Sequence, residues 1–172
     1  MGLIERRIVE EPWQEVSADL MELPQFKMRN KYLIVFEDLF TLWIEVKPVP
    51  RATRAAVQKA WEDLVIFRWR TPRRLIVDNW SEFDNKRTAE LVGTKSAPTP
   101  PYHHRANSTE RCNRTLKPMI AMFVEKDHRE GHIHIHEFRN AVTHASTKVA
   151  PAYLNFGRLP LPVSSLRLGI RR

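Results

Sequence analysis

The chain has 172 residues, of which 42% are hydrophobic and 28% charged, and this composition excludes a disordered chain, which would lack the apolar surface to offset its ordering entropy. The 12 prolines and 5 glycines follow no repeat, which excludes collagen, and the single cysteine excludes a disulfide scaffold and the usual thiolate zinc site. The net charge of +8 fits either a polyanionic partner, such as a nucleic acid, or an ordinary basic surface.

Membrane and secretory functions are also disfavoured. No apolar run approaches the roughly 20 residues that a membrane span needs, and the first ten residues lack the apolar core of a signal peptide. We therefore expect an intracellular protein that is not secreted and has no membrane partner.

Residues 13–49 have the pattern of three sequential antiparallel strands rich in branched and aromatic side chains. The three segments are EVSADLMEL, YLIVFEDL and TLWIEVKPV, with a tight turn expected at Leu39–Phe40. Asp38, at the end of the second strand, is interpreted as structural. Trp43 is assigned to the core rather than to a base-stacking surface.

A helix is predicted over about residues 52–69, followed by a short buried strand, RRLIVDN. The helix carries one apolar stripe at helical spacing, formed by Val57, Ala60, Trp61, Leu64 and Val65. A strand, a helix and a strand with this spacing predict parallel pairing through a crossover.

The residue pattern of the rest of the chain predicts a short helix over 84–93 and a very short edge strand over 94–98. It also predicts a helix from about Ser108, with a kink at Pro118. Two further helical segments are expected over 135–143 and 151–155. The predicted fold is α/β: a five-stranded mixed sheet, with three antiparallel strands and then two parallel ones, flanked by helices.

Three acids occupy positions that suggest a Mg²⁺ site. Asp19 lies within the first strand, Asp78 ends the strand LIVD, and Glu110 lies in the first turn of a helix. An acid inside an apolar strand is costly unless it is paired or bound to metal, and hard cations prefer carboxylate oxygens. The alternative makes Asp19 an exposed edge acid, Asp78 a turn residue and Glu110 a capping-box partner of Asn107.

Five stretches of the sequence resemble, in order, the catalytic core of retroviral and Ty3/gypsy-type integrases, in the ribonuclease H-like superfamily. They are PWQEVSADLMELP, NKYLIVFEDLFTLWIEVKPV, TPRRLIVDNWSEF, YHHRANSTERCNRTLKPMI and HEFRNAVTHASTKVAPAYLNFGRLP. The resemblance covers about residues 11–160. It leaves residues 1–10 as an N-terminal extension and residues 161–172 as a basic C-terminal tail.

The resemblance implies that Asp19, Asp78 and Glu110 are the catalytic, metal-binding acids of a Mg²⁺- or Mn²⁺-dependent phosphodiester transferase. Two ions would clamp a phosphodiester, one activating a water or a DNA 3′-hydroxyl and the other stabilising the leaving oxygen. The implied activity is DNA strand cleavage and joining, with element ends and target DNA as partners. The family implies a homodimer or higher oligomer, acting in the nucleus.

Further residues are candidates for contact with nucleic acid. Arg114 and Lys117 follow Glu110 at helical spacing, on the same face of the predicted helix. Asn79 lies in the turn after Asp78. The remaining candidates lie in a loop that resembles the family's mobile active-site loop: Tyr102, His103, Arg105 and Asn107. The alternatives are an ordinary solvated helix face for Arg114 and Lys117 and a plain turn residue for Asn79.

The sequence also departs from the family. Trp80 stands where the family usually has glycine, and the 31 residues between Asp78 and Glu110 are a few fewer than usual. We expect the chain to hold only the core, without a zinc domain before it or a DNA-binding domain after it. It would then be a polyprotein fragment, a decaying element or a host-adopted copy.

Two other functions compete with an active integrase core. One is a catalytically inactive or host-adopted nucleic-acid-binding module with the same fold. The other is a ribonuclease H-like nuclease, which is disfavoured because the motifs after Glu110 follow the integrases.

Overall fold

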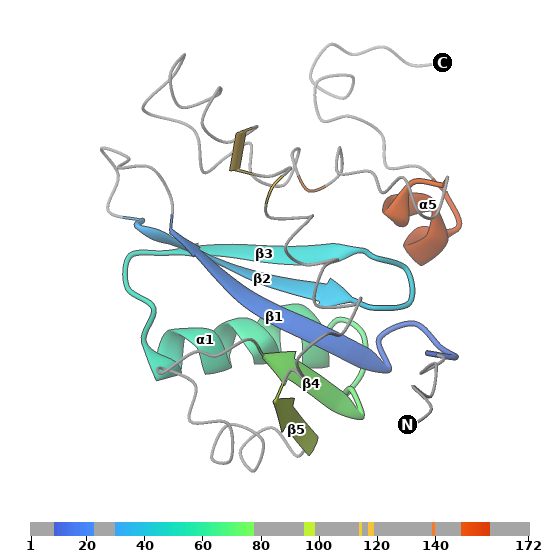
Figure 1. Ribbon diagram of the computed structural model, residues 1–172, viewed down its shortest axis with the longest axis horizontal. Coiled ribbons are helices and arrows are strands. Elements are labelled where there is room, and N and C mark those ends of the chain that lie inside the picture. The colour runs from blue at the N-terminus through green and yellow to red at the C-terminus, as the bar shows by residue number, and fades with distance from the viewer. Residues whose placement is uncertain are drawn as a thin grey trace, which may run out of the picture.

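Three antiparallel strands form the first half of the sheet in the computed structural model (Figure 1). The structure describes residues 9–22, 30–77, 95–98, 114, 117–118, 139 and 149–158. The strands are β1 (Glu15–Glu22), β2 (Tyr32–Asp38) and β3 (Ile44–Val49). β2 pairs with both of the others in antiparallel register, which confirms the sequential antiparallel arrangement predicted from the sequence.

A helical crossover follows β3. Helix α1 (Arg54–Trp61) begins after Thr53, whose side chain accepts a hydrogen bond from the Ala56 amide at 3.2 Å. The helix continues as a π-helical turn, η1 (Glu62–Ile66), where the amide of Phe67 donates to the carbonyl of Glu62. The sequence predicted one uninterrupted α-helix, but its apolar stripe is buried as expected.

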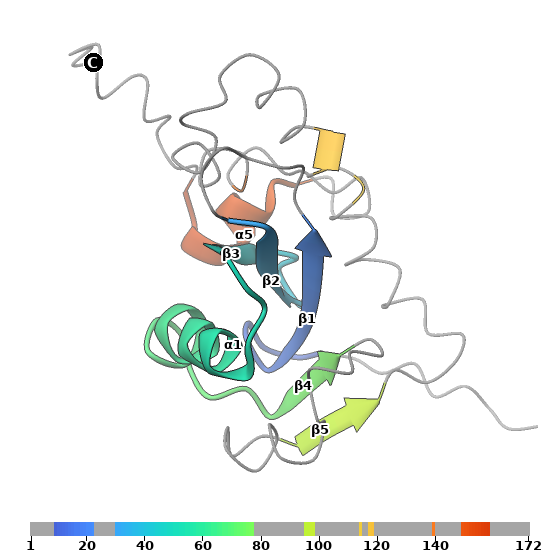
Figure 2. The same cartoon turned by 90° about the vertical axis from the view of Figure 1, so that its left-hand side faces the viewer.

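Two parallel strands complete the sheet. Strand β4 (Arg74–Val77) runs parallel to β1, and β5 (Lys95–Pro98) runs parallel to β4, so that the order is β3-β2-β1-β4-β5 (Figure 2). The predicted α/β class with a mixed sheet and a parallel crossover is therefore confirmed.

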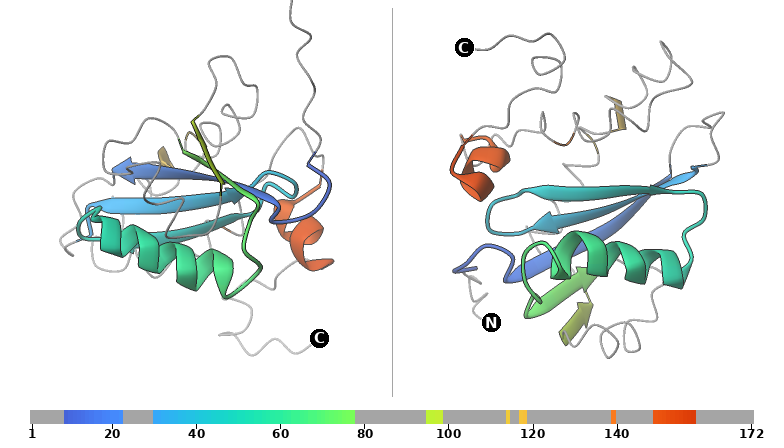
Figure 3. Two further views of the ribbon diagram at one scale, coloured as in Figure 1. Left: turned by 90° about the horizontal axis from the view of Figure 1, so that it is seen from below. Right: turned by 180° about the vertical axis from the view of Figure 1, so that it is seen from behind.

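The main core lies between the sheet and the crossover helix (Figure 3). Val16, Ala18, Ile34 and Phe36 face this layer, where Phe36 meets Trp61 edge-to-face with ring centroids 5.3 Å apart. Trp43 and Trp61 are both buried, as predicted. Val35 and Val46, on the opposite face, are also buried.

Helix α5 (Pro151–Phe156) packs at the end of the sheet where β1 begins (Figure 1). Trp13 stacks on Trp69 with ring centroids 4.8 Å apart, and its indole N–H donates to Oδ1 of Asn155 at 2.9 Å. Phe156 contacts Trp43 and Trp69. These aromatic contacts join α5 to the start of β1, the turn before β3 and the segment after η1.

The connection between β2 and β3 is built around the carboxylate of Asp38, which is fully buried. Its oxygens accept hydrogen bonds from the Trp13 amide at 2.8 Å, the Phe40 amide at 3.2 Å, the Thr41 amide at 3.0 Å and the Thr41 hydroxyl at 2.6 Å. The structural interpretation of Asp38 is therefore confirmed.

The predicted tight turn at Leu39–Phe40 was too short. Leu42 has a φ of 59°, and β3 begins at Ile44 rather than at Thr41. Thr41 cannot start the strand because both its amide and its hydroxyl bind Asp38.

Replacing Asp38 should destabilise the fold strongly. Asp38→Ala leaves the buried donors of Trp13 and Thr41 without an acceptor, and we expect a loss of about 3 kcal/mol or more in the free energy of unfolding. Urea denaturation followed by tryptophan fluorescence measures the change. Glu11→Gln, in an exposed ion pair with Arg70, is the matched control and should cost less than about 1 kcal/mol. Equal stabilities for the two variants would contradict this role of Asp38.

Candidate active site

Strand β1 carries Asp19 on the face of the sheet that points away from α1. Its neighbour Ala18 lies in the core beneath α1, and successive residues of a strand alternate between the two faces. Asp19 is partly exposed, and its Oδ1 accepts a hydrogen bond from the amide of Leu20 at 2.8 Å. The partners of Asp19 along the sheet are Val35 and then Val46, both buried.

Strand β4 ends beside this position. Val77 is the register partner of Ala18 in the parallel pairing of β4 with β1, and it is the last residue of its strand. Asp78 follows Val77 in the sequence but lies outside the described residues, as does Glu110. Of the three predicted acids, the structure therefore describes Asp19 alone, at a strand position that the prediction requires.

The remaining predicted site residues divide into two groups. Arg114 and Lys117 are helical and exposed, a position that fits contact with DNA and an ordinary solvated face equally. The others lie outside the part of the chain that the structure describes: Asn79, Tyr102, His103, Arg105 and Asn107. Among the described residues, no group of three or more His, Cys, Asp or Glu side chains could hold a metal ion.

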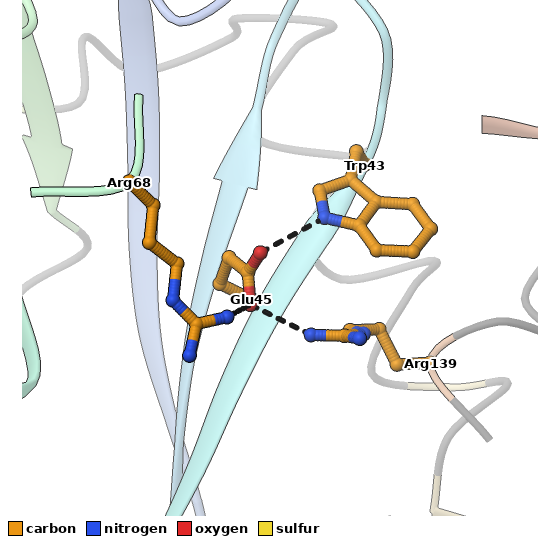
Figure 4. Close-up of polar contacts among 4 residues, drawn as sticks. All are labelled: Trp43, Glu45, Arg68 and Arg139. Atoms are coloured by element: carbon orange, nitrogen blue, oxygen red, sulfur yellow. Dashed lines mark hydrogen bonds and ion pairs between the residues drawn. The ribbon is translucent and has the colours of Figure 1, made fainter. Parts of the chain in front are cut away.

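A second polar cluster surrounds Glu45 on β3 (Figure 4). One oxygen of its carboxylate accepts hydrogen bonds from Arg139 at 2.8 Å and from Arg68 at 3.3 Å, and the other accepts from the indole N–H of Trp43 at 3.2 Å. The guanidinium of Arg139 also lies over the Trp43 ring, 4.9 Å from its centroid. The side chain of Glu45 is only 2% exposed, so the two arginines compensate a buried negative charge. Their ion pairs with Glu45 connect residue 139 and the segment after η1 to β3.

Comparison with known proteins decides between the possible families. The chain is 30% identical over 167 residues to gypsy retrotransposon integrase-like protein 1 of Bos taurus, covering 91% of this chain and 33% of that protein. It is 31% identical over 162 residues to the Homo sapiens protein of the same name, covering 88% of this chain and 30% of that protein. The chain contains an integrase-type core.

Retroviral proteins resemble the same core. The Gag-Pol polyprotein of avian reticuloendotheliosis virus is 32% identical over 114 residues, which are 64% of this chain and 10% of the polyprotein. A chain in the cryo-EM structure of the simian T-cell lymphotropic virus intasome, in complex with PP2A regulatory subunit B56 gamma, matches with a TM-score of 0.65 at 15% identity. That match covers 90% of this chain and 60% of the other.

These comparisons confirm the resemblance drawn from the five sequence stretches. No protein-family model matches the chain. The integrase-type core spans about a third of the length of the curated relatives that it matches. In the residues that the structure describes, the helices are too short or too polar to cross a membrane.

The Glu45 cluster of the integrase-type core was missed by the sequence analysis. One signal was present, because Glu45 is an acid inside the apolar segment LWIEV, the same pattern that singled out Asp19. Its partner Arg139 lies 94 residues away, and no local pattern connects the two.

Removing the charge of Glu45 should destabilise the core. In Glu45→Gln, the guanidinium groups of Arg68 and Arg139 lose the carboxylate that compensates them, and we expect a loss of about 3 kcal/mol in the free energy of unfolding. Chemical denaturation measures the loss. Asp63→Asn, which breaks the more exposed bridge between Lys47 and Asp63, is the control and should leave the free energy of unfolding nearly unchanged, because solvent screens an exposed pair. A Glu45→Gln variant as stable as that control would contradict the assignment.

The bridge between Lys47 and Asp63 predicts a pH dependence of its own. The Lys47 ammonium donates a hydrogen bond to the Asp63 carboxylate at 2.9 Å and holds its pKa below the ordinary value of 3.8. A lowered pKa gives a stabilising contribution that is present above pH 3.8 and is lost as the pH falls through the folded-state pKa. NMR titration of Asp63 should show the lowered pKa, and Lys47→Gln should raise it. A pKa that is the same in both proteins would show that the bridge does not form in solution.

Proposed function

We propose that the integrase-type core cleaves and joins DNA strands in a metal-dependent reaction that uses Asp19, Asp78 and Glu110. The proposal includes a ribonuclease H-like sheet of five strands and an assembly of two or more copies on DNA, acting in the nucleus. The net charge of +8 favours a polyanionic substrate. The relatives are named for retrotransposon integrases, and the matched solved chain belongs to a viral intasome.

The observation that carries the proposal is the register between β1 and β4. Ala18 pairs with Val77, and each of these residues is followed in the sequence by an aspartate. Adjacent strands lie about 4.8 Å apart, so a pairing that continues for one residue would bring Asp19 and Asp78 side by side. Strand alternation would then aim both carboxylates to the face opposite α1. Two acids converging in this way from neighbouring parallel strands suit a shared cation.

Asp19 has the properties that a Mg²⁺ ligand needs. Its carboxylate supplies hard oxygen donors, and its side chain is not fully buried, so a phosphate backbone can approach it. The hydrogen bond from the Leu20 amide to Oδ1 fixes the orientation of the carboxylate. Bound Mg²⁺ would supply Lewis-acid activation of the attacking hydroxyl and stabilisation of the leaving oxygen.

The protein side chains would have the task of binding and orienting DNA. In the proposed helix that begins near Glu110, Arg114 and Lys117 follow at spacings of four and seven residues, which places all three on one helix face. Both basic side chains are exposed and can contact phosphates beside the metal site. Asn79, Tyr102, His103, Arg105 and Asn107 are proposed to contact DNA from the adjoining turn and loop.

A branched DNA that mimics an integration product is the substrate that tests the core chemistry most directly. We expect the chain to resolve this substrate in Mg²⁺ or Mn²⁺ and to lose the activity in EDTA. Asp19→Asn, Asp78→Asn and Glu110→Gln should each lower the rate at least about a hundredfold, because each removes one metal-binding charge. Glu11→Gln, which replaces an exposed acid four residues before β1, should leave the rate unchanged.

The same experiment identifies the main alternative. If the folded chain binds the branched DNA in a salt-dependent way but yields no product with either metal, the fold is a nucleic-acid-binding module without catalysis. Full activity in the Asp19→Asn variant would refute the proposed use of the three acids. Circular dichroism of each variant establishes that the fold is retained.

A further inference from the structure

The exposed apolar surface of the described part of the chain is concentrated in three segments at one end of the sheet. These segments are the turn between β2 and β3, the residue after η1, and helix α5 together with Val149, two residues before it. Four of the six exposed large hydrophobic residues in this part of the chain are aromatic: Phe40, Phe67, Tyr153 and Phe156. We call these four side chains the aromatic patch.

One member of the aromatic patch, Phe156, packs on two tryptophans. Phe156 of α5 contacts Trp43, in the same turn as Phe40, and Trp69, two residues beyond Phe67. The β2–β3 turn, the end of η1 and α5 lie at the same end of the sheet in all views (Figures 1 and 3). Phe67 is 76% exposed and Tyr153 is 50% exposed, so both side chains are accessible from solvent.

Arginines are interleaved with the exposed rings. Phe67 is followed by Arg68 and Arg70, whose side chains are 47% and 40% exposed, and Phe156 is followed by the exposed Arg158. Arg70 pairs with Glu11 at the surface, where an ion pair contributes little and can be exchanged for a phosphate.

We propose that the aromatic patch binds single-stranded nucleic acid. Bases would stack on Phe67 and Tyr153, and Arg70 and Arg158 would contact the phosphate backbone. Exposed aromatic rings beside arginines are the combination with which proteins bind unpaired strands without reading their sequence. A second copy of this chain fits less well, because its own positive charge would oppose the arginines at the rim.

This surface is separate from the candidate active site. The aromatic patch lies at the end of the sheet where β1 begins and where Trp13 and α5 pack. Asp19 lies further along β1, next to the end of β4. The proposal therefore does not depend on the three acids.

Fluorescence anisotropy with a 5′-fluorescein oligothymidylate of about 15 nucleotides tests the proposal. EDTA in the buffer removes any contribution from metal bound at the acids. We expect Phe67→Ala and Tyr153→Ala each to weaken binding about tenfold, because each removes one stacked base. Tyr153→Phe should bind as the unmodified chain does, since it keeps the ring.

Leu154→Ala is the matched control. It removes an exposed apolar side chain from the same helix but no ring, and it should not change the affinity. The affinity for a blunt DNA duplex should be unaffected by the two aromatic variants, because paired bases do not offer their faces. Circular dichroism verifies that each variant is folded.

Three results would overturn the proposal. The first is unchanged affinity for the oligothymidylate in both Phe67→Ala and Tyr153→Ala. The second is equal competition by polyglutamate of matched charge, which would indicate a surface for acidic proteins. The third is a dimer that Tyr153→Ala dissociates in analytical ultracentrifugation without loss of oligothymidylate binding, which would indicate a surface for self-association.

Discussion

The parallel pairing of β1 with β4 is the constraint on which the rest of the structure depends. Two parallel strands need a crossover, and the segment from Arg54 to Ile66 supplies it as α1 and η1. The apolar stripe of that crossover fills the space above Val16, Ala18, Leu75 and Val77, which closes the main core. The same pairing places the end of β4 beside Ala18, next to Asp19. The core and the candidate active site therefore follow from one topological choice.

Two regions of the sheet have different chemistry. Asp19, in the middle of β1, and Asp78, which follows β4 in the sequence, are the residues that the relatives of this chain lead us to propose as metal ligands. At the end of the sheet where β1 begins, Trp13, Trp43 and Trp69 form a base on which α5 packs, with exposed aromatic side chains nearby. The aromatic contacts of α5 therefore lie before the position of Asp19 along β1.

Local patterns in the sequence predicted the strands, the crossover and the buried faces because burial repeats with the period of each element. Val57, Ala60 and Trp61 are one example, and all three are buried as their spacing required. Features that depend on a particular donor or partner were not predictable in this way. The start of β3 moved to Ile44 because Thr41 binds Asp38, and Glu45 meets an arginine 94 residues away. For the candidate site, the position of Asp19 followed from its strand, whereas its relation to Glu110 is a matter of family resemblance.

Burial separates Asp38 and Glu45 from Asp19. Asp38 and Glu45 are almost completely buried, and the protein surrounds each carboxylate with its own donors. A carboxylate in that state is committed to the fold, because a metal ion or a phosphate could reach it only by breaking those hydrogen bonds. Asp19 lies in an equally apolar strand, yet its side chain keeps access to solvent. Folding alone would favour an apolar residue at this position of the strand. Because the carboxylate of Asp19 is nevertheless accessible to solvent, Asp19 is the candidate for chemistry on DNA, and Asp38 and Glu45 are not.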